Sequence, residues 1–231
     1  MIADKNTQRI VLDLEMNPIS REKASEHTLA REVIEIGAIR VCRNATLDRF
    51  QTYVKPSFCR EMSPYIRRLT GIHDGDLKNA PSFKEAVRDL SEWIGTNETV
   101  ICTWSDADRR QLMEESTAKS VELPDNMVAF VDVQRLHYEK LGDDVARKQM
   151  ALQKASEQLG IIFSRKASHS ALYDASITAE ILNLLETGKY QKQLYLLRKA
   201  TSSSKESAGA GYTIGDLCKG VFEQWKSLQP V

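Results

Sequence analysis

Alternation of apolar and polar positions predicts three strands in the first quarter of the chain. The first is expected at 9–16, the second at 32–41 and the third at 50–54, where Pro56 ends it. Residues 17–29 are mostly polar and predict a loop between the first two strands. Because adjacent strands with short links usually pair, we expect an antiparallel meander.

The middle of the chain predicts helices that alternate with two further strands. Capping signals and apolar residues at helical spacing mark the helices. Helices are expected after Ser63 and at 82–94, 108–115, 133–140, 150–159 and 172–185, with strands at 99–103 and 127–132. Strands that alternate with helices indicate parallel pairing through crossover connections. The predicted fold is α/β: a mixed five-stranded sheet, antiparallel in its first half and parallel in its second, flanked by helices.

Residues 188–231 differ from the rest of the chain in charge, with seven basic residues against three acidic ones. A helix is predicted at 190–200, a Ser- and Gly-rich linker near 201–211, and an amphipathic helix at 213–228. We therefore expect a folded domain at 1–187 followed by a basic helical appendage. This C-terminal extension either packs against the body or a partner, or contacts nucleic acid directly.

Composition narrows the class of protein. The formal net charge is zero, with 32 basic and 32 acidic residues, which does not by itself indicate a nucleic-acid binder. No run approaches the roughly 20 apolar residues of a membrane span, and the N-terminus lacks the apolar core of a signal peptide. Cysteines stand at Cys42, Cys59, Cys102 and Cys218, without a Cys-x-x-Cys pair, which argues against zinc and disulfide frameworks. A cytoplasmic location is expected.

The first strand carries two carboxylates, Asp13 and Glu15, although Asp is depleted in strands. Because side chains alternate along a strand, both acids share the face of Val11. Two like charges on a largely buried strand are costly unless a cation neutralises them, and carboxylate oxygens suit Mg²⁺ or Mn²⁺. The alternative is an edge strand with a polar, solvated face.

Two more acids follow the strand at 99–103. They lie at the carboxyl end of a predicted parallel strand, where α/β sheets bind ligands. We expect Asp106 to cap the following helix and Asp108 to be a metal ligand, since Leu112 anchors Asp108 on the sheet-facing side.

The segment from His169 to Asp174 places an imidazole next to a fourth acid. Asp174 falls in the first turn of the helix at 172–185, and His169 lies in the loop before it. The pKa of histidine suits a general base near neutral pH. Arg165 and Lys166, just upstream, either meet a phosphate or form a solvated basic turn.

Together these motifs resemble the DEDDh family of 3′–5′ exonucleases. They are Asp13-x-Glu15, Trp104-x-x-x-Asp108 and His169-x-Ala171-x-x-Asp174, with Leu69-Thr-Gly-Ile72 between the first two. The resemblance covers about residues 9–187 and looks most like the branch of sporulation-inhibitor-like and histone-mRNA exonucleases, which favours RNA. Two positions depart from it: Asn17 stands where the family often has Thr, and Ser105 where it usually has Gly.

The resemblance implies an RNase H-like fold with two divalent metal ions, Mg²⁺ or Mn²⁺. His169 would accept a proton from the attacking water. The implied substrate is single-stranded RNA or DNA with a free 3′ end, the products are nucleoside 5′-monophosphates, and a homodimer is possible. The implied metal ligands are Asp13, Glu15, Asp108 and Asp174, and the implied contacts to the terminal nucleotide are Leu14, Met16, Thr70, Ile72 and Trp104. Leu14 and Met16 are equally well explained as core residues.

Two other functions remain open from the sequence. The neutral charge and basic tail also fit a nucleic-acid-binding or scaffolding module with little turnover. An RNase H-type endonuclease is a third hypothesis, which the His169–Asp174 motif and the Thr-Gly-Ile segment disfavour. No residue that would recognise the ribose 2′-OH is identifiable, so the sequence does not decide whether the substrate is RNA or DNA.

Overall fold

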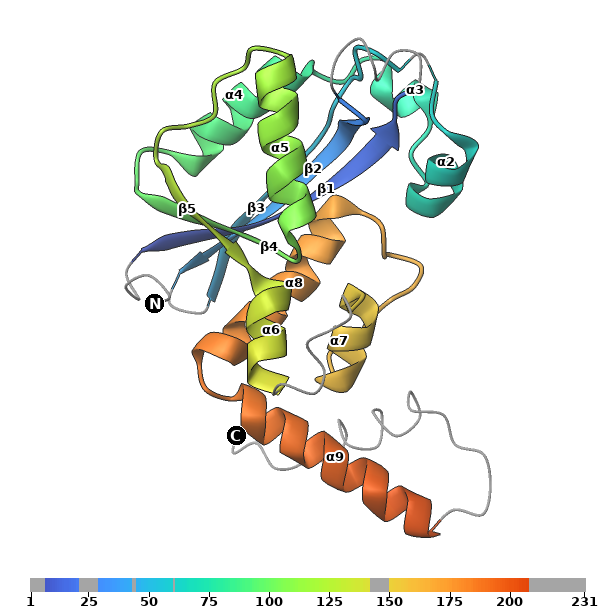
Figure 1. The fold of residues 1–231 in the computed structure, drawn as a ribbon, viewed down its shortest axis with the longest axis vertical. Helices are drawn as coiled ribbons and strands as arrows, with labels where there is room; N and C mark the ends of the chain where they lie inside the picture. Colours follow the sequence, from blue (N-terminus) through green and yellow to red (C-terminus); the bar gives the residue numbers. More distant parts are fainter. Residues whose placement is uncertain (1–6, 21–28, 43–44, 60, 142–149, 208–231) are drawn as a thin grey trace.

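The computed structural model describes residues 7–20, 29–42, 45–59, 61–141 and 150–207. A five-stranded sheet of order β3-β2-β1-β4-β5 forms its centre (Figure 1). Pairing is antiparallel within β1–β2–β3 and parallel for β1–β4 and β4–β5, which confirms the predicted mixed sheet. The strands are β1 (Gln8–Pro18), β2 (Arg31–Cys42), β3 (Ala45–Tyr53), β4 (Thr99–Thr103) and β5 (Met127–Asp132).

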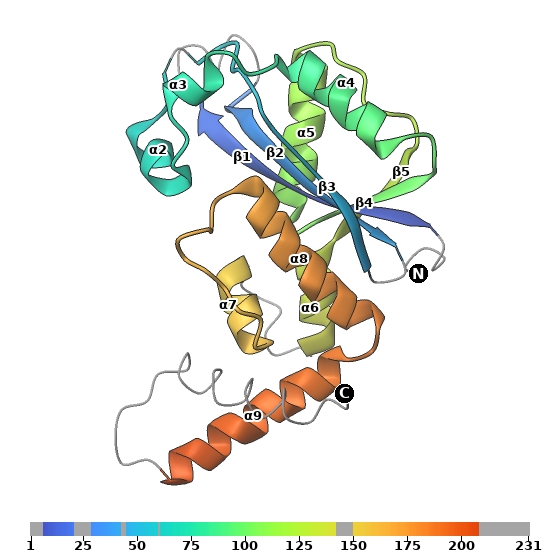
Figure 2. The ribbon, with the colours of Figure 1, turned by 180° about the vertical axis from the view of Figure 1, so that it is seen from behind.

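Helices cover both faces of this sheet (Figures 1 and 2). Apolar residues of α4 and α5 pack on one face, and those of α6, α7, α8 and α9 form a second core on the other. The helices are α2 (Pro64–Thr70), α3 (Asp74–Leu77), α4 (Phe83–Ile94), α5 (Asp106–Ala118), α6 (Val133–Leu141), α7 (Leu152–Gln158), α8 (Ala171–Glu186) and α9 (Tyr190–Ser207). No helix in the described part of the chain is long and apolar enough to cross a membrane.

The alternation of β1 is as predicted. Ile10, Leu12 and Leu14 belong to the core under α4 and α5, whereas Val11 belongs to the core under α8. The odd-numbered acids of β1 therefore face α8, which contacts β1, β2 and β3 (Figure 2).

The meander is longer than the hydrophobic pattern predicts. β1 continues past a register shift after Glu15 and still pairs with β2 at Pro18, inside the expected loop. β3 begins at Ala45 rather than at residue 50, because it is an edge strand whose early residues are exposed and carry no apolar alternation.

Two expectations are corrected. Asp106 does not cap α5: the Ser105 side chain accepts the N–H of Ala107, and Asp106 instead pairs with Arg109 at 2.5 Å. The linker expected near 201–211 begins inside a helix, since α9 runs to Ser207. Serine does not break a helix as Gly or Pro does, and neither occurs between 190 and 207. The helix predicted at 213–228 lies outside the described residues.

Candidate active site

The two acids of β1 lie on the central strand, with β2 on one side and β4 on the other. In the β1–β2 ladder, Asp13 is opposite Gly37 and Glu15 is opposite Glu35. Gly37 allows the start of α8 to approach, because a Cβ there would lie 2.1 Å from the backbone nitrogen of Leu172. The glycine of β2 therefore lets the first turn of α8 reach the acids of β1.

The third acid, Asp108, comes from the first turn of α5 and is 7% exposed. Its carboxylate accepts the backbone N–H of Leu14, the residue between the two acids of β1. This bond fixes the start of α5 against β1, so Asp108 lies beside the acids of that strand. The sequence-based choice of Asp108 over Asp106 is therefore consistent with where the two side chains lie.

The fourth acid and the imidazole lie at the start of α8. His169 adopts a left-handed backbone conformation with φ of 62°, which is uncommon for a residue other than glycine. Its N–H donates to Oδ2 of Asp174 at 3.2 Å, which holds the loop in place. Potential metal-ligating atoms of Glu15, His169 and Asp174 all lie within 4.8 Å of one another.

The acids of this site are protonated more readily than isolated carboxyls. Burial raises the pKa of Asp13 well above its ordinary value, and its acidic neighbours raise it further. Burial, together with the charges of Asp174 and Glu35, raises the pKa of Glu15 to about 8. Burial also raises the pKa of Asp108, to about 7, although the Leu14 N–H opposes this.

The pKa of Asp174 is also raised above its ordinary value. Burial is the main cause, and the N–H and the charge of His169 lower its pKa in part. Its Oδ1 is buried without a hydrogen-bond partner among the described residues. This carboxylate oxygen lies near several other acids and has no hydrogen bond to stabilise its charge. A bound divalent cation would supply that stabilisation. The donor set is therefore suited to a hard cation, and Glu15 and Asp174 are the clearest ligands.

A fifth acid, Glu35 of β2, is 2% exposed and is not among the predicted site residues. Its Oε1 accepts from Nε2 of Gln51 at 2.6 Å, and its Oε2 accepts the N–H of Ala171, the first residue of α8, at 3.1 Å. The signal was present in the sequence, because Glu35 interrupts an apolar strand in the same way as the acids of β1. Glu35 therefore holds the start of α8, where His169 and Asp174 lie.

Several side chains expected to touch the terminal nucleotide are buried. Leu14 is 5% exposed, Ile72 3% and Trp104 8%. The indole Nε1 of Trp104 donates to the carbonyl of Met150 at 3.1 Å, and the ring packs in the core under α8. The structure thus gives these three side chains a packing role. Met16 is half-buried.

The segment around α2 is tied to the end of β1. Asn17, which stands where the family often has Thr, is 1% exposed. Its Nδ2 donates to the Glu61 carbonyl at 3.2 Å, and its Oδ1 accepts the Ser63 N–H at 2.8 Å. Thr70 at the end of α2 is half-buried, and its hydroxyl accepts the Ile72 N–H at 3.1 Å. Asn17 thus positions α2 rather than presenting its amide to solvent.

The site thus combines a mixed five-stranded sheet with acids from β1, α5 and α8, of which Glu15 and Asp174 lie beside one imidazole. A family model described as "Exonuclease" (RNase T) matches residues 10–182, and the chain belongs to this family. Its relatives place it in the DEDDh 3′–5′ exonuclease superfamily, as the motifs predict, and support an exonuclease enzyme.

The similar proteins include a DNA polymerase subunit and an exoribonuclease. DNA polymerase III subunit epsilon of Buchnera aphidicola subsp. Schizaphis graminum is 26% identical over 187 residues, which cover 80% of this chain and 77% of that protein. ERI1 exoribonuclease 2 of Danio rerio is 28% identical over 201 residues. These cover 77% of this chain but only 35% of that longer protein.

Solved structures confirm the fold. The nuclease domain of 3′hExo, a DEDDh family member bound to rAMP, has a TM-score of 0.67 at 20% identity, covering 79% of this chain and 94% of that one. E. coli Exonuclease I in complex with a dT13 oligonucleotide has a TM-score of 0.62 at 15% identity, covering 82% of this chain and 43% of that one.

Proposed function

We propose that this protein is a metal-dependent 3′–5′ exonuclease that releases nucleoside 5′-monophosphates from single-stranded nucleic acid, with RNA as the favoured substrate. One observation carries the proposal. Glu15 of β1 meets His169 and Asp174 of the α8 segment within 4.8 Å, although more than 150 residues separate them along the chain. Asp13 and Asp108 add their charges to the same site.

The chain's own residues have distinct roles in this proposal. Asp13, Glu15, Asp108 and Asp174 would hold divalent cations, which when bound stabilise the charge on the attacking and leaving oxygens. His169 accepts a proton from the attacking water. The bond from its backbone N–H to Asp174 orients the loop, so that the imidazole lies beside the acids.

RNA is favoured for reasons that come from relatives. One similar protein is named an exoribonuclease, and the similar nuclease domain of 3′hExo was solved with rAMP. Other relatives are DNA polymerase subunits, and Exonuclease I was solved with DNA. The preference therefore needs a direct comparison of the two polymers.

The decisive experiment compares matched single-stranded RNA and DNA oligonucleotides, labelled at the 5′ end, with Mg²⁺, with Mn²⁺ and with EDTA. We expect a ladder that shortens one nucleotide at a time from the 3′ end, only with metal, and faster on RNA. A circular oligonucleotide of the same sequence should stay intact, whereas an endonuclease would open it.

A variant tests the proposed base. His169→Ala should lower the rate by about 10²–10⁴-fold while substrate binding in EDTA is retained. Binding without metal-dependent product in the wild type would instead favour the nucleic-acid-binding module. Unchanged turnover by His169→Ala would remove the imidazole from the mechanism.

A further inference from the structure

The connection between α7 and α8 leads into the active site and carries two bases that the proposed function does not use. It covers residues 159–170 and contains Arg165 and Lys166 but no acid. Both side chains are exposed, and within the described parts of the chain neither forms an ion pair or a side-chain hydrogen bond. By contrast, Arg109 of α5 is paired with Asp106. Arg165 and Lys166 are therefore available to bind an anion.

Hydrogen bonds to the backbone hold these two bases in a defined turn. The N–H of Ser168 donates to the carbonyl of Ser164 at 2.9 Å, which closes one helical turn. The Ser168 hydroxyl donates to the carbonyl of Arg165 at 2.9 Å. We call residues 164–168 the basic turn, because Arg165 and Lys166 occupy its middle with their side chains exposed.

The basic turn is attached to the part of α8 that carries a proposed metal ligand. The N–H of Ser164 donates to the Tyr173 hydroxyl at 2.6 Å, and the Phe163 and Tyr173 rings pack edge to face with their centroids 5.7 Å apart. Tyr173 immediately precedes Asp174, and His169 directly follows the turn. One helical turn is only about 5.4 Å long. The same short segment therefore carries both the imidazole of the active site and two exposed cations.

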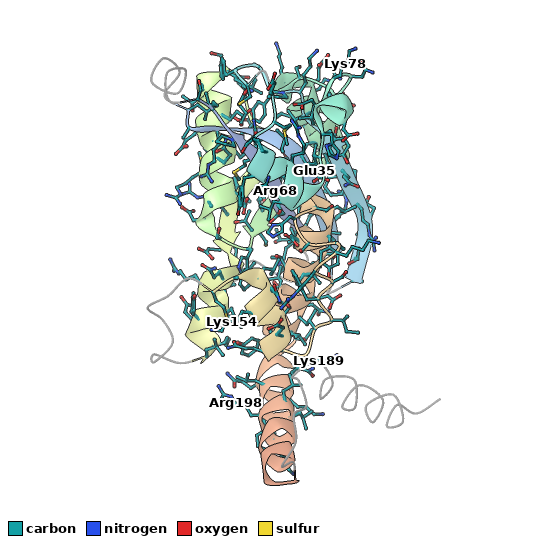
Figure 3. All side chains as sticks on the ribbon, turned by 90° about the vertical axis from the view of Figure 1, so that its right-hand side faces the viewer. Glu35, Arg68, Lys78, Lys154, Lys189 and Arg198 are labelled. Atoms are coloured by element: carbon teal, nitrogen blue, oxygen red, sulfur yellow. The ribbon has the colours of Figure 1, made fainter. Side chains whose placement is uncertain are left out.

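Charges on α7 do not cancel those of the basic turn. Lys154 and Glu157 are both exposed on this helix, and they balance each other. Figure 3 faces the side of the molecule on which the connection runs from α7, which carries the labelled Lys154, to the start of α8, which Glu35 holds. The basic turn is therefore the net positive part of the chain that leads from α7 to the active site.

We propose that the basic turn binds the substrate phosphates immediately 5′ of the scissile phosphodiester, through Arg165 and Lys166. The planar fork of an arginine matches two phosphate oxygens, and a lysine adds a point charge. Such contacts to the backbone position a strand without reading its bases. This inference rests on the proposed function, because it takes the active site as the position of the 3′ end.

The test compares two substrates that differ in what lies 5′ of the scissile bond. One is a single-stranded oligonucleotide of about 10 nucleotides. The other is the p-nitrophenyl ester of a nucleoside 5′-monophosphate, which contains a phosphodiester to cleave but no further phosphate. The turn variant carries Arg165→Gln and Lys166→Gln. The matched control carries Arg49→Gln and Lys84→Gln, which replace an exposed arginine of β3 and an exposed lysine of α4.

For the oligonucleotide, we expect the turn variant to lower kcat/KM by about 10–100-fold, because a hydrogen bond to a charged group contributes about tenfold or more. Fluorescence anisotropy in EDTA gives the binding constant without turnover. The slope of log K against log salt should become shallower by about 1.4, since single strands contribute roughly 0.7 per phosphate contact. The turn variant should cleave the p-nitrophenyl ester as wild type does, and the control variant should match wild type on both substrates.

A neutral linkage locates the phosphate that each base contacts. The oligonucleotide carries one methylphosphonate, placed at each linkage 5′ of the scissile one in turn. Where that linkage is the partner of Arg165, wild type should lose about tenfold in kcat/KM, whereas Arg165→Gln should lose little further. Lys166→Gln gives the same test for the second base. Losses that fail to add in this way identify a direct contact between the side chain and that phosphate.

Several results would overturn the proposal. Equal losses on both substrates would mean that the turn acts on the scissile phosphate or through His169. Wild-type kinetics of the turn variant on the oligonucleotide, an equal loss in the control, or additive losses at every linkage would mean that the bases make no specific contact. If wild type cleaves neither substrate, the proposed function fails, while the salt dependence of binding in EDTA still decides whether the turn binds phosphate.

Discussion

Two clusters of buried acids, each formed by residues of the sheet and of the helices beside it, are compensated in different ways. Glu32 and Glu115 are both fully buried, and Nζ of Lys119 lies 2.7 Å from each. The acids of the active site include a buried carboxylate oxygen that has no partner among the described residues. A buried charge is tolerated only when something pairs with it, so the two clusters serve different purposes.

The Lys119 cluster joins three parts of the chain. Glu32 accepts the N–H groups of Ser57, Phe58 and Cys59, and Glu115 accepts the N–H of Val33. Burial alone would raise the pKa of Glu32, but its bond to Lys119 and the charge of that lysine bring it below its ordinary value. Burial outweighs the same contacts at Glu115 and leaves its pKa raised. Both acids nevertheless have a cationic partner within the protein and stabilise the fold.

The active-site acids lack such a partner, and removing one should cost activity rather than stability. Asp13→Asn should lower the rate of oligonucleotide hydrolysis by about 10³-fold or more, because a cation there stabilises charge in the transition state. The metal-free variant should be at least as stable as wild type, since it relieves repulsion among acids. Urea unfolding in EDTA measures this, with Asp125→Asn as the exposed control. A variant that is both active and destabilised would contradict the distinction.

The opposite result is expected at Lys119. Lys119→Met should lower the free energy of unfolding by about 3–5 kcal/mol, because it leaves two buried carboxylates without their cation. Activity per folded molecule should stay near wild type. Lys84→Met, an exposed lysine of α4, should change stability by less than about 0.5 kcal/mol. A small loss at Lys119 would mean that the backbone N–H donors alone compensate these acids.

The stability of the metal-free protein should depend on pH through the acids of the active site. The pKa of Glu15 is raised to about 8 and that of Asp108 to about 7, so the folded metal-free protein keeps protons that unfolded carboxyls lose near pH 4. Their contribution to stability is full below about pH 4 and is lost as the pH rises toward 8. Stability in EDTA should therefore fall by about 4–6 kcal/mol between about pH 5 and 8.

Metal should reverse this trend, because cations bind the ionised carboxylates and displace their protons. Unfolding in urea, measured from about pH 5 to 8 with EDTA and again with Mg²⁺ or Mn²⁺, checks both statements. Glu15→Gln should flatten the slope in EDTA. An equal slope in Glu15→Gln and wild type would show that the raised pKa of Glu15 does not govern the pH dependence.

Features that depend on residues close together in the chain could be predicted from the sequence. β4 and β5 have the predicted bounds, because apolar runs flanked by polar residues define them locally, although only β4 is buried throughout. Asp13, Glu15 and Asp108 were predicted as ligands because acids in a buried strand, or at a helix start after a parallel strand, need a chemical reason. His169 and Asp174 were predicted from an imidazole in the loop just before a helix whose first turn carries an acid. The burial of Trp104 depends on a contact with Met150, 46 residues away, which no local pattern reveals.

The role of Glu35 also depends on a long-range contact that no local sequence pattern reveals. It sits in an apolar strand just as Glu15 does, but its role depends on the start of α8, 136 residues later. The hydrophobic pattern of the sequence could not distinguish an acid that accepts a hydrogen bond from the start of a helix from an acid that binds a metal ion. The hydrogen bonds from Gln51 and Ala171 make that distinction.

Glu35 offers a further test of the difference between the two kinds of buried acid. It lies near the active-site acids, but both of its carboxylate oxygens accept hydrogen bonds. Glu35→Ala removes the acceptor for the Ala171 N–H and should lower activity per folded molecule by about tenfold, by loosening the segment that carries His169 and Asp174. Glu35→Gln keeps an acceptor oxygen and should retain most of the activity. Single-turnover hydrolysis at saturating metal measures both.

The conservative variant separates two explanations of that loss. If Glu35 acts by position, the Gln variant restores the rate, because its amide oxygen can still accept from Ala171. If Glu35 is instead a metal ligand, removal of its charge should lower metal affinity in both variants alike. A metal titration of hydrolysis, in which only Glu35→Ala loses rate and neither variant shifts the midpoint, would assign Glu35 to the scaffold that orients the site.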